Sequence, residues 1–172
     1  MNAARKQHGA ILVSALLILI TLTIIGISAM QMTRMQERMA GNSRDLNVAF
    51  QGAEAALRDG EERIRLQASR PDTCATPGCQ WWQRNFLTAL AEQPAAWWAA
   101  NGRPYGNPSV KELTELNEDP MYVIEELRDV PDDLTIGHGP PSSRDFYQVT
   151  ARSTGITGNT NTVVQSTFVR RY

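Results

Sequence analysis

Few side chains in this chain of 172 residues could do chemistry, and the two cysteines, Cys74 and Cys79, stand out. They frame the hexapeptide CATPGC, in which Pro77 and Gly78 favour a tight turn that can bring the two sulfurs together. Two cysteines with no histidine nearby cannot complete a structural zinc site. In an oxidising periplasm such a pair is expected to form a disulfide, with two free thiols as the alternative. The spacing does not match the CxxC motif of redox enzymes.

Other residues with catalytic or metal-binding potential are scattered. The two histidines, His8 and His138, are far apart in the sequence, which argues against a histidine-based metal site or acid–base relay. Asp129, Asp132 and Asp133 could hold calcium, but their spacing matches no EF-hand, and a solvated acidic loop is favoured. The sequence also lacks a phosphate-binding glycine loop and a Ser–His–Asp set. We therefore expect no enzyme, no cofactor and no metal.

The charge distribution points to the amino terminus. The formal net charge is −1, and no basic face is interleaved with aromatic residues, so nucleic acid is not an expected partner. Arg5 and Lys6 precede Gly9, and no charged residue follows until Arg34. A basic head that ends so abruptly at a glycine indicates a leader that a peptidase removes after Gly9.

An apolar segment follows at residues 10–30. As a helix these residues would span about 31 Å, which matches the core of a bilayer. The run is longer than the apolar region of a cleavable secretory signal and ends in no A-x-A site, so it is expected to be retained. By the positive-inside rule, Arg5 and Lys6 hold the amino end in the cytoplasm, and the rest of the chain lies across the membrane. A plain signal anchor is the simplest alternative.

The helical pattern continues beyond the membrane segment. Apolar or small residues recur at a helical period at Leu46, Ala49, Phe50, Ala53, Leu57, Gly60 and Ile64. Pro71 prevents easy continuation, so one helix is predicted from about Ala10 to about Ser69. Residues 40–42, with the sequence AGN, are its weakest point and are expected to bend or unwind.

The remaining residues predict a small mixed domain. Residues 80–91 and PAAWWAANG at 94–102 are predicted to be short helices, and Ser109 with Glu112 resembles a capping box. Three strands are predicted at residues 121–127, 146–152 and 162–171, the last two as a hairpin, and residues 128–145 are predicted to be a loop. Four tryptophans are expected to fill the core and its margins rather than form a ligand cage: Trp81, Trp82, Trp97 and Trp98.

These features together resemble a type IV prepilin, and more specifically the PilX family of minor pilins. The segment HGAILVSALLILITLTIIGISAM is similar to the N-terminal helix of that family, and QERMAGNSRDLNVAFQGAEAALRDGE is similar to the segment after it. FYQVTARSTG and TVVQSTFVRRY resemble the C-terminal strands. The resemblance implies an α+β, pilin-like fold, with a long N-terminal helix packed on a small antiparallel sheet of three to four strands. Its expected parts are a leader at 1–9, a transmembrane and assembly helix at 10–30, an amphipathic continuation at 31–69 and a periplasmic globular domain at 70–172.

The resemblance also implies a processing path. Prepilin peptidase would cut between Gly9 and Ala10 and N-methylate the new amino group of Ala10, where the family usually has phenylalanine. Major pilins carry glutamate at the fifth residue after the cut, and here that residue is Ser14. Because Ser14 cannot pair with the terminal amine of a neighbouring subunit, the chain is better suited to the pilus tip than to repeated use along the fibre.

The expected function is therefore that of a minor pilin that primes type IV pilus assembly at or near the tip. Expected partners are prepilin peptidase, other minor pilins, the major pilin, a PilY-type tip adhesin and inner-membrane lipid. The expected location is the inner membrane before assembly and the cell-surface pilus tip afterwards. A minor pseudopilin of type II secretion is the nearest alternative, although K-type pseudopilins usually carry a large inserted domain for which this chain has no room.

Overall fold

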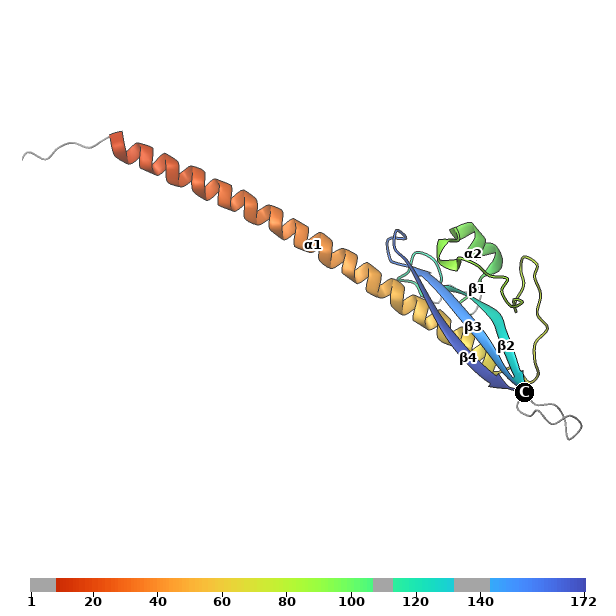
Figure 1. Cartoon of the computed structure of the whole chain (residues 1–172). Helices are drawn as coiled ribbons and strands as arrows, with labels where there is room; N and C mark the ends of the chain where they lie inside the picture. The colour runs from red at the N-terminus through yellow and green to blue at the C-terminus, as the bar shows by residue number, and fades with distance from the viewer. Residues whose placement is uncertain (1–8, 107–112, 132–142) are drawn as a thin grey trace, which may run out of the picture. The chain divides into compact units, whose positions relative to one another are not determined.

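The computed structural model describes residues 9–106, 113–131 and 143–172. The chain forms a long helix α1 (Gly9–Arg65), a 3-10 turn η1 (Leu90–Glu92), a short helix α2 (Ala95–Asn101) and four strands (Figure 1). The strands are β1 (Arg103–Pro104), β2 (Met121–Pro131), β3 (Ser143–Thr154) and β4 (Asn161–Arg171). The chain divides into two compact units between Ser43 and Arg44.

Helix α1 passes through both units. Its start agrees with the sequence prediction, but it ends at Arg65, short of the predicted Ser69. The end is fixed by Arg170 in β4, whose guanidinium donates to the carbonyl oxygens of Arg65 and Gln67. These carbonyls have no partner within the helix, so a cation that reaches them favours termination there. Residues 40–42 are α-helical, and the predicted unwinding at that point is therefore wrong.

The four strands form one antiparallel sheet in the order β1-β2-β3-β4. Strands β3 and β4 form the predicted hairpin, with pairs from Thr154–Asn161 to Arg144–Arg171. All three predicted strands are present and longer than expected, so the predicted loop at 128–145 is wrong at both of its ends. Asp129 and Asp145 are cross-strand neighbours in β2 and β3. Asp132, Asp133, His138 and the capping box at Ser109 and Glu112 lie outside the described residues, as does His8.

The second half of α1 packs on one face of the sheet, as expected for an α+β pilin-like fold (Figure 1). Its buried stripe consists mostly of small residues, with Leu57 and Ile64 as the two large ones: Ala49, Gly52, Ala53, Ala56, Leu57, Gly60 and Ile64. A Cβ atom at Gly60 would lie 2.6 Å from Val149 Cγ1 and 3.0 Å from Tyr122 Cδ2. The helix therefore approaches the strands more closely than any side chain at Gly60 would allow.

The opposite face of the sheet carries a second core around Trp82, Trp98, Val123 and Cys79. Trp98 comes from α2, which follows Pro94 and ends before Gly102 as predicted. Trp97 is half-buried beside this core, and Trp81 belongs to the core under α1. The tryptophans thus fill the core and its margins, as the sequence indicated.

The predicted helix at residues 80–91 is wrong. Trp82 instead forms an isolated parallel β-bridge with Glu125 of β2. Its backbone N–H donates to Ile124 O at 2.8 Å, and its carbonyl oxygen accepts from Glu126 N at 3.0 Å. The Glu125 carboxylate, which is 6 % exposed, then accepts from Phe86 N at 2.9 Å and Leu87 N at 3.2 Å. Bonds to β2 therefore replace the bonds that a helix would have made.

The carboxylate of Asp45 connects α1 to the turn between β3 and β4. It accepts from the backbone N–H of Thr157 at 3.1 Å, from the Thr157 hydroxyl at 2.9 Å and from the Thr160 hydroxyl. Gly155 lies so close to this carboxylate that a Cβ atom would not fit. Charge-assisted bonds of this kind are about twice as strong as neutral ones, so Asp45 fixes the turn on the helix.

We expect Gly60→Ala to destabilise the globular unit by about 1–3 kcal/mol, because the added methyl overlaps Val149. Thermal unfolding of the full chain in detergent, followed by tryptophan fluorescence, measures this. Gly41→Ala is the matched control, since nothing lies within 4 Å of its added Cβ. A Gly60→Ala midpoint equal to that of Gly41→Ala would contradict the close packing.

A pH-dependent effect is expected at Glu125. Burial raises the pKa of its carboxyl, and the bonds from the N–H groups of Leu87 and Phe86 offset part of that rise. Because the folded state holds the proton more tightly than the unfolded state, stability falls as pH rises from about 4 through the raised pKa. Glu125→Gln keeps an acceptor oxygen and removes the buried charge. Its midpoint minus that of the wild type should therefore grow with pH, and a difference that stays constant with pH would contradict a raised pKa at Glu125.

Candidate assembly surface

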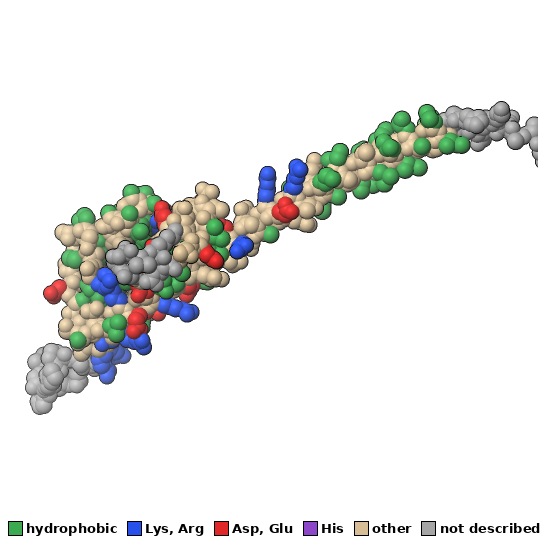
Figure 2. Space-filling view, turned by 180° about the vertical axis from the view of Figure 1, so that it is seen from behind, with side chains coloured by type: hydrophobic (Ala, Val, Ile, Leu, Met, Phe, Trp, Pro, Cys, Tyr) green, Lys and Arg blue, Asp and Glu red, His purple; other side chains and the backbone are tan. Residues whose placement is uncertain are grey.

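The first half of α1 presents a continuous apolar surface. Its large side chains are 43–73 % exposed, and Figure 2 shows them along the helix. They are Ile11, Leu12, Val13, Leu16, Leu17, Ile18, Leu19, Ile20, Leu22, Ile24, Ile25, Ile27 and Met30. A surface of this extent marks a protein or membrane interaction. Within the described residues, α1 is the one helix that is long and apolar enough to cross a membrane.

The hydroxyl groups on this surface are satisfied within the helix. Ser14 Oγ donates to Ile11 O at 2.9 Å, and the hydroxyls of Thr21 and Thr23 donate to Ile18 O at 2.8 Å and Ile20 O at 2.7 Å. A polar group with an internal partner costs little in an apolar environment. This half of α1 therefore offers its surroundings apolar contact without an unpaired hydroxyl at these three positions.

The predicted processing point lies at the start of this surface. Helix α1 begins at Gly9, so the Gly9–Ala10 bond belongs to its first turn, and the basic leader lies outside the described residues. Ser14 is in the second turn, where its hydroxyl is bound to its own backbone. Cleavage after Gly9 and methylation of Ala10 stay predictions.

Cys74 and Cys79 form the expected disulfide, with their Cα atoms 5.9 Å apart. Gly78 has a φ of 81°, so the turn uses the backbone freedom of glycine. The backbone of Cys74 pairs with the Trp81–Gln83 segment through bonds of 2.9 Å to Trp81 O and 3.0 Å from Gln83 N. The disulfide loop is thus held beside Trp82, which itself lies beside β2.

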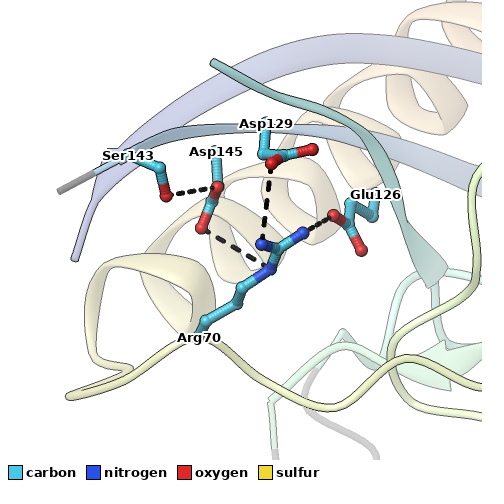
Figure 3. Close-up of polar contacts among 5 residues, drawn as sticks. All are labelled: Arg70, Glu126, Asp129, Ser143 and Asp145. Atoms are coloured by element: carbon cyan, nitrogen blue, oxygen red, sulfur yellow. Dashed lines mark hydrogen bonds and ion pairs between the residues drawn. The ribbon is translucent and has the colours of Figure 1, made fainter. Parts of the chain in front are cut away.

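A polar cluster that the sequence did not indicate surrounds Arg70 (Figure 3). Its guanidinium forms an ion pair with Glu126 and lies 4.0 Å from Asp129 Oδ2 and 3.8 Å from Asp145 Oδ2. Asp145 is fully buried and accepts from Ser143 Oγ at 3.1 Å. The cluster joins the segment that follows α1 to strands β2 and β3.

The acidic side chains of this cluster favour the charged form of Arg70. Desolvation lowers the pKa of the Arg70 guanidinium, but the hydrogen bond and charge of Glu126 and the charges of Asp145 and Asp129 outweigh it and raise the pKa overall. Asp129, which was expected in a solvated acidic loop with calcium binding as the alternative, lies in β2 and faces the Arg70 guanidinium. The described residues contain no group of three or more acidic, histidine or cysteine side chains placed to hold a metal ion.

Sequence reasoning also missed Asp45 and Glu125. Asp45 lies in the predicted long helix and Glu125 in a predicted strand. Neither pattern distinguishes a carboxylate that binds a distant backbone segment from one that faces solvent. The partners of Asp45 are 112 and 115 residues away, at Thr157 and Thr160. A hydrophobic period carries no information about such pairs.

Comparison with protein families gives two matches. Residues 8–58 match the family model described as PilX N-terminal, and residues 47–170 match the one described as type IV pilus assembly protein PilX C-term. The chain belongs to the PilX family of type IV pilus assembly proteins. A search of curated proteins and a search of solved structures each found no match.

Membership of this family accounts for the two parts of the chain, an exposed apolar half-helix and a globular unit. This PilX-family pilin takes part in pilus assembly and therefore interacts with other pilus components. Its exposed apolar half-helix fits a membrane-anchored pilus protein. The globular unit carries the disulfide and the polar cluster that hold its long segments in place.

We expect the Cys74–Cys79 disulfide in the protein extracted from cells without reductant. A loop this short stabilises the fold by about 2 kcal/mol before any strain. Alkylation followed by mass measurement should find no labelled cysteine, whereas the same sample treated with reductant should gain two labels. Two labels without reductant would show that the thiols are free.

Proposed function

We propose that this PilX-family pilin primes type IV pilus assembly and lies at or near the pilus tip. The observation that supports this most is Ser14, the fifth residue after the proposed cut. Its side chain is a neutral hydroxyl, which donates to Ile11 O, and it therefore has no negative charge to pair with the terminal amine of a neighbouring subunit. Major pilins, which this chain resembles, carry a glutamate at this position, and that glutamate pairs with the amine. A subunit without the acid fits best where no subunit lies beyond it.

The proposed role is that of an interaction protein and not of an enzyme. The apolar half of α1 anchors the chain in the inner membrane, with Arg5 and Lys6 on the cytoplasmic side. Prepilin peptidase removes the leader and methylates Ala10. The helix then packs with other minor pilins and the major pilin, and a PilY-type adhesin is a further partner at the tip. The match to a type IV pilus assembly family favours this proposal over a role in type II secretion.

The proposal predicts that Gly9→Val blocks processing, since a side chain at the scissile bond obstructs the peptidase. The precursor should keep residues 1–9, and piliation should be lost. Ala15→Val, a change of similar size within the exposed helix, should be processed normally. Immunoblotting and intact-mass measurement of both variants test this. A Gly9→Val protein that is cut normally would refute the requirement for glycine, and a mature wild-type chain that does not begin at Ala10 would refute the cleavage site.

The tip position predicts that the protein is scarce in sheared pili relative to the major pilin. Loss of the protein should reduce the number of pili, while the fibres that form keep an ordinary structure. Ser14→Glu should bring no gain in piliation, because the buried carboxylate would lack an amine partner. Quantitative immunoblotting and immunogold microscopy of sheared pili measure this. Label spread evenly along the fibres would overturn the tip position and leave family membership intact.

A further inference from the structure

A cavity of about 320 Å³ lies beside the second core, between α2 and the segment that precedes it. Three aromatic rings line it, those of Trp82, Phe86 and Trp97. The Trp82 ring stacks with the Phe86 ring, with their centroids 5.3 Å apart, and with the Trp97 ring, with their centroids 6.3 Å apart. A volume of this size falls at the lower end of the range for small-ligand sites.

Two of these rings are accessible from solvent. Phe86 is 48 % exposed and Trp97 is half-buried, whereas Trp82 belongs to the core. Burial in the core therefore accounts for Trp82 but not for the exposed area of its two neighbours. Aromatic side chains that gather in this way at an accessible cavity are typical of binding sites.

The polar groups of the cavity include two unused acceptors. The side-chain nitrogen of Gln93 donates to Thr88 O at 3.4 Å, and that of Asn101 donates to Trp97 O at 2.8 Å. No group of the described residues donates to Gln93 Oε1 or to Asn101 Oδ1. Among the described residues that line the cavity, none is charged. A ligand that fits is therefore neutral and supplies hydrogen-bond donors.

The segment that carries Phe86 is held in a strained conformation. Asn85 has a φ of 58° and Ala89 a φ of 50°, and they are the only non-glycine residues with a positive φ in the part of the chain that the structure describes. Side chains disfavour this left-handed region, and such strain is concentrated at functional sites. Glu125 fixes the segment by accepting from the N–H groups of Phe86 and Leu87. The aromatic side of the cavity is thus preformed.

We propose that this cavity binds one pyranose ring of a neutral saccharide. The apolar C–H face of the ring stacks on Phe86 and Trp97, and hydroxyls at its edge donate to Gln93 Oε1 and Asn101 Oδ1. A saccharide combines an apolar face with hydroxyl donors and carries no charge, as this lining requires. The proposal does not depend on where in the fibre the subunit lies.

A proline-rich peptide is not the expected occupant, although such peptides also dock into aromatic grooves. Proline has no backbone N–H, so a proline-rich segment would leave the oxygens of Gln93 and Asn101 without a donor. Acceptors that lose water and gain no donor reduce affinity. Sugar hydroxyls can donate to both.

Saturation-transfer NMR on the full chain tests the proposal. The chain is kept in a detergent without a sugar headgroup, its aromatic protons are irradiated, and lactose, maltose or chitobiose is added at millimolar concentration. At least one of these disaccharides should receive saturation, mainly at the protons of one ring. Sorbitol, which has hydroxyls but no ring, and decaproline should receive none.

Two substitutions with matched controls locate the binding. Phe86→Ala should weaken binding of that disaccharide by about fivefold through the loss of stacking. Phe50→Ala should not, because Phe50 is likewise 48 % exposed but lies outside the cavity. Gln93→Leu should weaken binding by about fivefold through the loss of an acceptor, whereas Gln51→Leu, also outside the cavity, should not. An unchanged unfolding midpoint and an intact disulfide show that each variant is folded.

Three results would overturn the saccharide site. They are no saturation of any of the three disaccharides, saturation of sorbitol equal to that of a disaccharide, and binding by Phe86→Ala and Gln93→Leu equal to that of their controls. Saturation of decaproline alone would identify a peptide site in its place.

Discussion

The close packing of α1 on the sheet is the contact on which the globular unit depends. Gly60 and the alanines of the buried stripe allow the helix backbone to approach Val149 and Tyr122, and this approach forms the main core. Asp45 holds one end of the contact through Thr157 and Thr160, and Arg170 caps the helix at the other. These polar bonds fix where along the sheet the helix lies.

The first half of the same helix must be stable in an apolar environment, which the globular unit does not provide. Its first half leaves apolar side chains exposed and keeps the hydroxyls of Ser14, Thr21 and Thr23 bound to its own backbone. Such a surface is costly in water and favourable in a bilayer or among other apolar helices. Membership of the PilX family agrees with a membrane-anchored pilus protein.

The sequence predicted the features that follow from periodicity and failed where distant polar groups decide the structure. The long helix, the β3–β4 hairpin, α2 and the disulfide follow from regular patterns or local turn chemistry. The expected helix at 80–91 is absent because Glu125 and the backbone of β2 bind Phe86, Leu87 and Trp82. Residues 128–131 and 143–145, which were expected to be loop, belong to β2 and β3, where strand pairing and the Arg70 cluster hold them. Composition predicts a loop there, but it carries no information on an ion-pair partner such as Arg70, which lies 56 residues before Glu126.

The most direct test of the account is the amino terminus of this chain in sheared, purified pili. Immunoprecipitation of this chain from the fibre fraction, followed by peptide mass spectrometry, should find an N-methylated Ala10 as its first residue. That result would join processing after Gly9 to incorporation into a pilus. A chain that starts at Met1 and stays in the membrane fraction, with none in the fibres, would contradict the account and indicate a plain membrane anchor.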